Sequence, residues 1–552
     1  MILAALRTPD LVVLFVYFAL LIGAGFYFRK RSGTVEGFTV ANRSLPGWVV
    51  GLSIFGTYLS SNTFIGVPGK AYGSNWNSFV FSLSLPIGAF IAVKWFVPFY
   101  RRHAGLSAYE HLERRFGAWA RVYAVVCYLL TQVARVGTIM FGVALGLHAL
   151  TGWNIAAIII VSGFAVTLYT LLGGIEAVIW TDAIQSVILT LGAAVVVILI
   201  LSGMPEGAGQ AVSLAIEADK FSLGDFGPSL TKSTFWVVLF YGIFINLTNF
   251  GIDQNFVQRY HAADSEKAAG RSVWMGALMY MPVVLMFFFI GSILFSYYQV
   301  NPDLLQEVKF DKAIEMMDGE HLRRQTGGSL LGRLRHWLGG HDESPGLTTV
   351  WYTPGFGWGD QAWMQPNDYA DNVLPHFIAN QMPVGLAGLL IAALFAAAMS
   401  SIDTSLNSSS TIALQDFYRR WFRPDADEAQ SLRFLRVMTI VWGSIGTGVA
   451  LAIIGVKSIL DEWWKISGVF AGGMLGLFLL GFISRRANNA GAAVGATIGL
   501  LVILWMTFTP EMEGDLGWLR SPFHANMITV IGTLSIFLIG LGASRVLGRK
   551  NG

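Results

Sequence analysis

The sequence predicts an all-α protein that crosses a membrane many times. Hydrophobic residues make up 54% of the 552 residues and charged residues only 13%, and the mean hydropathy is +0.56. A soluble protein of this length would carry about twice that charged fraction. Many apolar runs approach ~20 residues, which is the length that a helix needs to span a bilayer. Because a helix also satisfies its own backbone hydrogen bonds in lipid, we expect a multi-pass helical protein of a plasma membrane or bacterial inner membrane.

Thirteen apolar runs are expected to form the spanning helices. Their approximate ranges are 9–28, 45–69, 75–100, 121–149, 153–173, 176–203, 233–257, 272–298, 380–418, 432–455, 458–484, 488–508 and 522–544. Most of the 37 Lys and Arg residues fall in one set of the loops between these runs, and Arg259 after the seventh run is counted among them. Basic loops lie on the cytoplasmic side, so the N-terminus is predicted to be outside and the C-terminus inside.

Polar residues interrupt the second and the seventh of these runs. Gly56 and residues 60–63 break the second run, and Asn246, Asn249 and Asp253 break the seventh. The two runs would begin two five-helix units, spans 2–6 and 7–11. Interrupted helices at matching places in two halves indicate the central site of a transporter, because the exposed carbonyls can coordinate a cation. Two Gly-kinked helices without a ligand are the alternative.

Hydroxyl residues are concentrated in the second half of the ninth run. Ala397, Ser400, Ser401 and Thr404 follow i, i+3, i+4, i+7 spacing and therefore share one face of a helix. Hydroxyl oxygens are ligands that suit a hard cation such as Na⁺. Small hydroxyl residues also allow membrane helices to pack closely, so the pattern fits either an ion site or a packing surface.

A few charged residues lie inside the predicted spans. Arg135 is in the middle of the fourth span, and an arginine at that depth faces a cavity or a partner. Asp182, in the sixth span, either attracts Na⁺ on the inner side or pairs with a cytoplasmic arginine, and Asp403 is a second carboxylate at similar depth. Lys94 lies near a span end and can extend its amine to the membrane surface. Lys465 either extends its amine to the membrane surface in the same way or has a functional role.

The sequence has no motif for catalysis or for nucleic-acid binding. It contains no HExxH, P-loop, Gly-x-Ser-x-Gly or Cys/His metal pattern. The single cysteine excludes an intrachain disulfide framework. We expect a protein that is not an enzyme and has no organic cofactor, whose partners are a small solute and the bilayer, and that functions as a monomer. The loop 299–379 is interpreted as an outer lid with short helices.

Five segments carry a resemblance to the sodium/solute symporter family, which includes the sodium–glucose cotransporters and the bacterial sodium–sialic acid symporters. These segments are GFTVANRSLPGW, FIGVPGKAYG, GGIEAVIWTDAIQ, FGIDQNFVQRY and AALFAAAMSSIDTSLNSSSTI. The resemblance covers nearly the whole chain. It implies two inverted five-helix repeats of the LeuT-like kind, at 45–231 and 232–484. An extra N-terminal helix would lie in 1–44 and two further helices in 485–552.

The resemblance also implies a main Na⁺ site. Its ligands would be the backbone carbonyls of Gly56, Leu59 and Ala397 and the hydroxyls of Ser400 and Ser401. Na⁺ would be the coupling ion.

Some members of the family carry a second Na⁺ site nearer the cytoplasm. The matching positions here are Asp182, Ser400, Asp403 and Thr404. Asp403 stands where a hydroxyl is more usual. It could strengthen the site, bind a proton or repel Asp182, which leaves one or two Na⁺ ions per cycle open.

For the solute, the sequence matches the sialic acid symporters in part. Ser60, Thr63 and Arg135 match the residues that hold the substrate carboxylate, and a planar guanidinium suits a carboxylate. A glutamine of those symporters is replaced by Ser82. A glutamine of the neutral-sugar carriers is replaced by Trp464.

The function expected from the resemblance is Na⁺-coupled import of an acidic sugar such as sialic acid by alternating access. Carriers of neutral sugars, polyols or monocarboxylates are the alternatives within the family. Outside it, a membrane sensor and a channel are the alternatives.

Overall fold

The computed structural model describes residues 8–60, 62–103, 105–309, 312, 365–383, 385–454, 459–510 and 514–547. Within these residues all regular structure is helical, apart from one isolated backbone bridge between Leu45 and Ala263. The all-helical class predicted from the composition is therefore confirmed. Most of the predicted lid 299–379, Ser61, and the side chains of Trp464 and Lys465 lie outside the described residues.

The helices differ widely in length. The long ones are α1 (Thr8–Phe28), α9 (Ala118–Thr151), α10 (Ile155–Ser202), α12 (Phe235–Ile252), α14 (Glu266–Val300), α19 (Leu386–Ile412), α20 (Glu428–Ala452), α21 (Ile459–Ile483), α22 (Asn489–Phe508) and α23 (Met527–Leu547). The shorter ones are α2 (Val35–Val40), α3 (Gly47–Tyr58), η2 (Asn62–Gly66), α4 (Val67–Gly73), α5 (Val80–Leu83), α6 (Leu85–Ile91), α7 (Val97–His103), α8 (Glu110–Phe116), α11 (Ala208–Glu217), α13 (Gln254–Ala262), α18 (Pro366–Gln381) and η6 (Ala413–Phe422). Four further short turns of helix are η1 (Ala41–Arg43), η3 (Trp76–Phe79), η4 (Ala92–Phe96) and η7 (Gly514–Leu519).

Ten helices of the described part of the chain are long and apolar enough to cross a membrane. Two shorter apolar stretches accompany them, α3 (Gly47–Tyr58) and the part of α21 from Ser467 to Ile483. Each of the thirteen predicted spans overlaps a helix. The predicted spans 153–173 and 176–203 correspond to two helical segments that meet at a kink within the 48-residue element α10. The count of thirteen crossings and the orientation of the termini stay predictions.

The kink in α10 is made by Gly174. Its φ of +58° is a backbone conformation that residues with a side chain rarely adopt. A Cβ at this position would also lie 3.1 Å from the Cα of Phe38 in α2. The glycine therefore lets α10 bend closely over α2.

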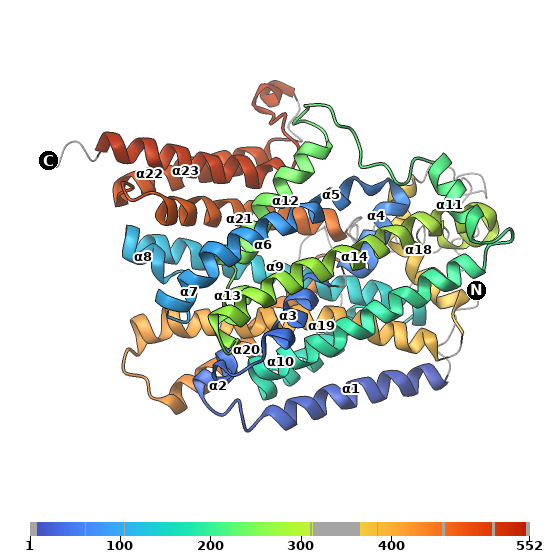
Figure 1. Cartoon of the computed structure of the whole chain (residues 1–552), viewed down its shortest axis with the longest axis horizontal. Helices are drawn as coiled ribbons and strands as arrows, with labels where there is room; N and C mark the ends of the chain where they lie inside the picture. Colours follow the sequence, from blue (N-terminus) through green and yellow to red (C-terminus); the bar gives the residue numbers. More distant parts are fainter. Residues whose placement is uncertain are drawn as a thin grey trace.

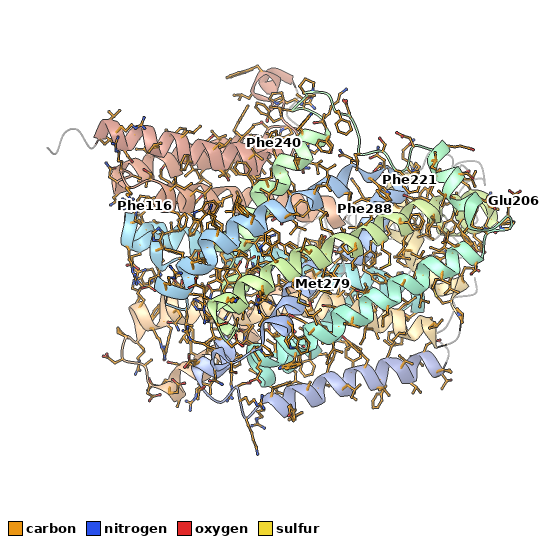
Figure 2. All side chains as sticks on the ribbon, in the orientation of Figure 1. Phe116, Glu206, Phe221, Phe240, Met279 and Phe288 are labelled. Atoms are coloured by element: carbon orange, nitrogen blue, oxygen red, sulfur yellow. The ribbon has the colours of Figure 1, made fainter. Side chains whose placement is uncertain are left out.

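The helices run side by side along the long axis of the molecule (Figure 1). α1 begins at the end where α11 and α18 lie, and α23 ends at the opposite end, near α8. Side chains fill the spaces between the helices (Figure 2). α19 is the central helix: almost all of its residues are buried, and it packs against α1, α3, α9, α10, α13 and α20.

Both predicted helix interruptions are confirmed. α3 ends at Tyr58, Leu59 is extended with φ −89° and ψ 98°, and the helix resumes with η2 and α4. α12 ends at Ile252, Asp253 is extended with φ −76° and ψ 119°, and the helix resumes with α13. We call these two places the first break and the second break.

A cation caps the far end of each broken helix. Lys220 Nζ donates to the carbonyls of Tyr72 (2.6 Å) and Ser74 (3.1 Å) at the end of α4. Arg101 Nη1 donates to three carbonyls at the end of α13, those of residues 260, 261 and 263, at 3.0 to 3.2 Å. The last carbonyls of a helix have no partner within it, and its negative dipole end favours a cation. The two broken helices are thus anchored in the same way at opposite ends of the molecule.

Candidate cation and solute sites

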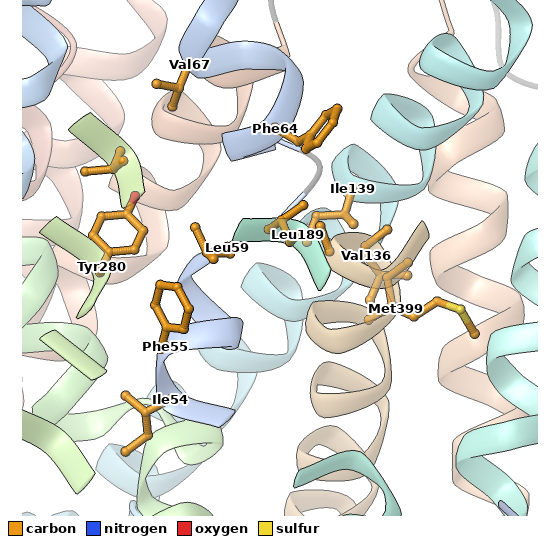
Figure 3. Packing of buried hydrophobic residues seen from close by; sticks show 14 of the residues in the cluster. Ile54, Phe55, Leu59, Phe64, Val67, Val136, Ile139, Leu189, Tyr280 and Met399 are labelled. Atoms are coloured by element: carbon orange, nitrogen blue, oxygen red, sulfur yellow. The ribbon is translucent and has the colours of Figure 1, made fainter. Parts of the chain in front are cut away.

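The first break meets the hydroxyl face of α19. Ser400 Oγ donates to the Gly56 carbonyl at 3.0 Å, and this carbonyl also accepts the Leu59 N–H at 3.0 Å. Figure 3 places Leu59 and Phe55, at the end of α3, beside the turn of α19 that carries Met399. The helical face predicted from the spacing of the hydroxyls therefore lies against the interrupted backbone.

Ser401 supplies an oxygen with no bonding partner. The residue is fully buried, and its Oγ has no hydrogen-bond partner among the residues that the structure describes. A buried polar group without a partner is costly. Hydroxyl and carbonyl groups such as those of Ser401, Ser400 and Gly56 are neutral oxygens of the kind that hard cations prefer. The residues at the first break therefore fit a bound Na⁺.

Asp182 lies in a dense polar cluster between α3, α10, α13 and α19. Its Oδ2 accepts hydrogen bonds from Ser53 Oγ (2.6 Å) and Arg259 Nη2 (2.7 Å). The same Nη2 donates to Thr404 Oγ1 at 2.8 Å. Of the two roles open for Asp182, the structure contains the arginine pair.

The prediction that Arg259 belongs to a cytoplasmic loop is wrong. Its side chain has no exposed surface and extends from α13, the second half of the second broken helix. The helix continues past the apolar run that defined the seventh span, because Asp182 neutralises the buried charge.

Asp403 completes this cluster. Its Oδ1 accepts the backbone N–H of Thr404 at 2.6 Å, and the residue is fully buried. The structure thus brings together Asp182, Asp403 and Thr404, the residues predicted for a second cation site, but it also places the guanidinium of Arg259 among them.

Arg135 lines a cavity at the second break. The cavity lies between α9, α12 and α21, and its lining residues are Tyr128, Thr131, Gln132, Arg135, Ile245, Thr248, Asn249, Asp253, Ser467, Ala471 and Met474. Arg135 Nη2 donates to the Thr57 carbonyl at 3.0 Å, and Nη1 lies 3.9 Å from Asp253 Oδ2. A cavity and a partner, the two surroundings expected for Arg135, are both present.

The other predicted solute residues do not line this cavity. Thr63 Oγ1 donates to the Tyr58 carbonyl at 3.1 Å, and Ser60 lies beside it in the first break. Ser82 is buried on α5. The Thr57 carbonyl is the described link between Arg135 and the first broken helix.

Asp253 is a site residue that the sequence reasoning recognised only as a helix breaker. Its Oδ1 caps α13 by accepting the Asn255 N–H at 2.8 Å, while Oδ2 faces Arg135. The sequence signal that could have identified it is a pair of opposite charges, Arg135 and Asp253, at mid-membrane depth. Each lies on an interrupted or cavity-lining helix.

A comparison with protein families identifies the chain. Residues 38–314 and 349–499 match the model of the sodium:solute symporter family. The chain belongs to this family. It is 32% identical to the sodium/sialic acid symporter NanT of Aliivibrio fischeri, with 97% of this chain and 92% of that protein covered. It is 32% identical to the sodium/sialic acid symporter SiaT of Proteus mirabilis, with 96% and 93% covered. A sodium-dependent multivitamin transporter of Oryctolagus cuniculus is 28% identical, with 90% and 70% covered.

Solved structures agree with this assignment. The substrate-bound, outward-open state of a Na⁺-coupled sialic acid symporter superposes with a TM-score of 0.80, at 30% identity and with 98% of both chains covered. Mhp1, a nucleobase-cation-symport-1 family transporter, superposes with a TM-score of 0.53 at 15% identity, with 93% of this chain and 95% of that chain covered. This second likeness shows a shared fold alone. The symporter is therefore a multi-pass membrane protein with the LeuT-like fold that the sequence predicted.

Proposed function

We propose that this symporter imports an acidic sugar such as sialic acid, coupled to Na⁺, by alternating access. The observation that carries the proposal is the guanidinium of Arg135, which lines a cavity at a helix break and has only 13% of its side-chain surface exposed. A carboxylate is the group that a planar guanidinium binds best, with two parallel hydrogen bonds. The hydroxyl and amide side chains around it provide partners for the hydroxyls of a sugar.

The coupling ion is assigned to the first break. Gly56, Leu59 and Ala397 would offer carbonyls to Na⁺, and Ser400 and Ser401 would offer hydroxyls. The unpartnered Oγ of Ser401 supports this assignment. One charge crossing a 100 mV potential supplies ~2.3 kcal/mol. On the scale of ~1.4 kcal/mol per decade, this energy supports roughly fifty-fold accumulation of the solute per ion.

A second Na⁺ site at Asp182, Asp403 and Thr404 is proposed only for a state in which Arg259 moves away. In the present arrangement the guanidinium already holds Asp182 and Thr404. A cation entering there would have to displace it, so we propose that the site at the first break carries the coupling ion.

We further propose the predicted arrangement of the chain in the membrane. It has thirteen crossings, with the N-terminus outside and the C-terminus inside, and the protein works as a monomer. The five-helix units are 45–231 and 232–484, flanked by 1–44 and 485–552. Solute contacts of Ser60, Thr63 and Ser82 belong to this proposal too, for a state in which the first break faces the cavity.

Another carboxylate is the second candidate solute. The same guanidinium would bind a vitamin acid or a monocarboxylate. Relatives named as a multivitamin transporter and as monocarboxylate transporters align with about nine-tenths of this chain.

Thermal unfolding of the purified symporter tests the choice of solute. A ligand that binds the folded state raises the melting temperature by mass action. N-acetylneuraminate, galactose, inositol, lactate and biotin are each added in NaCl and in choline chloride. We expect stabilisation by N-acetylneuraminate in Na⁺ only. A shift with galactose or inositol would contradict the acidic solute, and a shift with lactate or biotin alone would select the second candidate.

A further inference from the structure

The N-terminal helix α1 lies outside the two proposed five-helix units but packs directly against the helices of the cation site. It contacts α10 and α19 along its length. Its buried residues Asp10, Leu14, Leu21, Gly25 and Phe28 recur at helical spacing and form one face. The opposite face is exposed, as expected for a surface in contact with lipid. This asymmetry points to one specific partner surface on α10 and α19.

Asp10 caps α19 from a distance of 375 residues in the chain. Its Oδ1 accepts the N–H groups of Gly385 and Gly388, both at 2.8 Å, and the residue is 2% exposed. The first N–H groups of a helix need such acceptors, and the residue preceding α19 is Gly385, which has no side chain to supply one. A Cβ at Gly388 would lie 2.6 Å from the Asp10 Cα. The glycine therefore permits this close approach.

Tyr17 joins the two helices next to the proposed cation ligands. Its hydroxyl accepts a hydrogen bond from Gln185 Nε2 at 2.9 Å and lies 3.9 Å from Met399 Sδ. Gln185 is one turn beyond Asp182 on α10, and Met399 directly precedes Ser400 on α19. Phe18 adds an edge-to-face contact with Phe395, with ring centroids 5.1 Å apart.

α19 thus lies between the first broken helix and α1. Figure 3 shows the side chain of Met399 pointing away from Phe55 and Leu59 of the broken helix. The next residue, Ser400, is about 100° further round the helix, and its hydroxyl meets the Gly56 carbonyl. A shift of α1 against α19 would therefore change the geometry of Ser400 and Ser401.

We propose that α1 is a positioning element of the cation site, with Asp10 and Tyr17 as its positioning residues. Asp10 fixes α19 along its axis, and Tyr17 fixes the turn before Ser400 against α10. Neither touches the ion. Ligands must be held to within about 0.5 Å for productive binding, so loosening either contact weakens Na⁺ binding. The inference rests on the proposed Na⁺ site at the first break.

Na⁺ titrations of four variants of the full-length symporter test the inference. Tyr17→Phe removes only the hydroxyl, and Asp10→Ala removes the cap. Asp10→Asn keeps an oxygen that accepts the two N–H groups. Phe15→Leu changes the exposed face of α1, where Phe15 is 75% exposed. The readouts are the Na⁺ concentration for half-maximal thermal stabilisation and for half-maximal uptake in proteoliposomes, together with maximal uptake at saturating Na⁺.

We expect Tyr17→Phe and Asp10→Ala to raise the half-saturating Na⁺ concentration roughly three- to tenfold, the effect of one or two lost hydrogen bonds. Maximal uptake should stay within about twofold, and Asp10→Asn and Phe15→Leu should match the unmodified protein. If Asp10→Ala does not fold, Tyr17→Phe still decides. The inference would be overturned if Tyr17→Phe left the Na⁺ requirement unchanged. It would also be overturned if Tyr17→Phe lowered the stability of the protein without changing the Na⁺ requirement. A lack of any Na⁺ response in the unmodified protein would instead overturn the proposed function.

Discussion

The two helix breaks of this symporter share a scaffold but differ in chemistry. Each contains an extended residue, Leu59 in the first break and Asp253 in the second, and each has the end of its second half anchored by a cation, Lys220 for α4 and Arg101 for α13. At the first break, the neutral carbonyl oxygen of Gly56 meets the hydroxyl of Ser400. The second break carries Asp253, which faces Arg135 at 3.9 Å.

This difference indicates a division of roles between the breaks. Neutral oxygens can replace the water shell of a small cation without adding charge to the membrane interior. A paired guanidinium and carboxylate can instead receive a solute that offers a carboxylate to one and hydroxyls to the other. We therefore propose that the first break holds the coupling ion and the second break holds the solute.

The largest effect is expected from Arg135→Ala. Loss of the guanidinium leaves a substrate carboxylate without its charged partner, so uptake of N-acetylneuraminate should fall more than a hundredfold, the scale of a buried charge pair. The Na⁺ concentration for half-maximal thermal stabilisation should change by less than about threefold, because the first break keeps its ligands. Radiolabelled uptake and Na⁺ titration of the melting temperature measure the two effects.

Arg135→Lys and Asp253→Asn are the matched controls for this substitution. Lysine keeps the charge but lacks the planar fork, so we expect it to restore only part of the uptake. Asp253→Asn keeps an oxygen that can cap α13. Equal loss of Na⁺ binding and solute binding in Arg135→Ala would show that the two breaks do not act separately.

A small effect is expected from Lys220→Met at the end of α4. Burial lowers the pKa of the Lys220 amine to about 8. Between pH 8 and about 10.5, the usual pKa of lysine, the unfolded chain binds more protons than the folded one, so this group's contribution to stability rises with pH. The stability difference between the unmodified protein and Lys220→Met should therefore increase from pH 8 to pH 10.

Melting temperatures of both proteins across this pH range check the prediction. The substitution also removes two hydrogen bonds to carbonyls, which costs about 1 kcal/mol each. Solute and Na⁺ affinities should stay within about twofold, because the amine lies at the end of α4 remote from the break. A stability difference that shrinks as the pH rises would contradict the assigned protonation of Lys220.

Sequence reasoning identified the features that depend on local patterns. The hydroxyl face of α19 follows from helical spacing, and the two breaks follow from polar residues inside apolar runs. The depth of Arg135 in its run indicated a cavity or a partner. These signals are contained in windows of about twenty residues.

Features that depend on contacts between residues far apart in the chain could not be predicted from the sequence. Hydropathy ends the seventh span near residue 257 and therefore predicts Arg259 in a loop. In the structure, Asp182, 77 residues away in sequence, stabilises the charge of Arg259 inside the fold. The cap of α19 by Asp10 joins residues 375 or more positions apart and has no local pattern. Asp253 was recognised as a helix breaker, but its position opposite Arg135 requires the packing of α9 against the second break.

The most direct test of the division between the breaks is a Na⁺ titration of Ser401→Ala. Ser410→Ala is the matched control, because Ser410 is a buried serine of the same helix whose hydroxyl bonds to the Leu406 carbonyl at 2.7 Å. Melting temperature is measured against Na⁺ concentration, with and without saturating N-acetylneuraminate. The account predicts that Ser401→Ala folds, needs about tenfold more Na⁺ for half-maximal stabilisation, and binds the solute normally once Na⁺ is saturating. A Na⁺ requirement equal to that of Ser410→Ala and of the unmodified protein would contradict it and remove the ion from the first break.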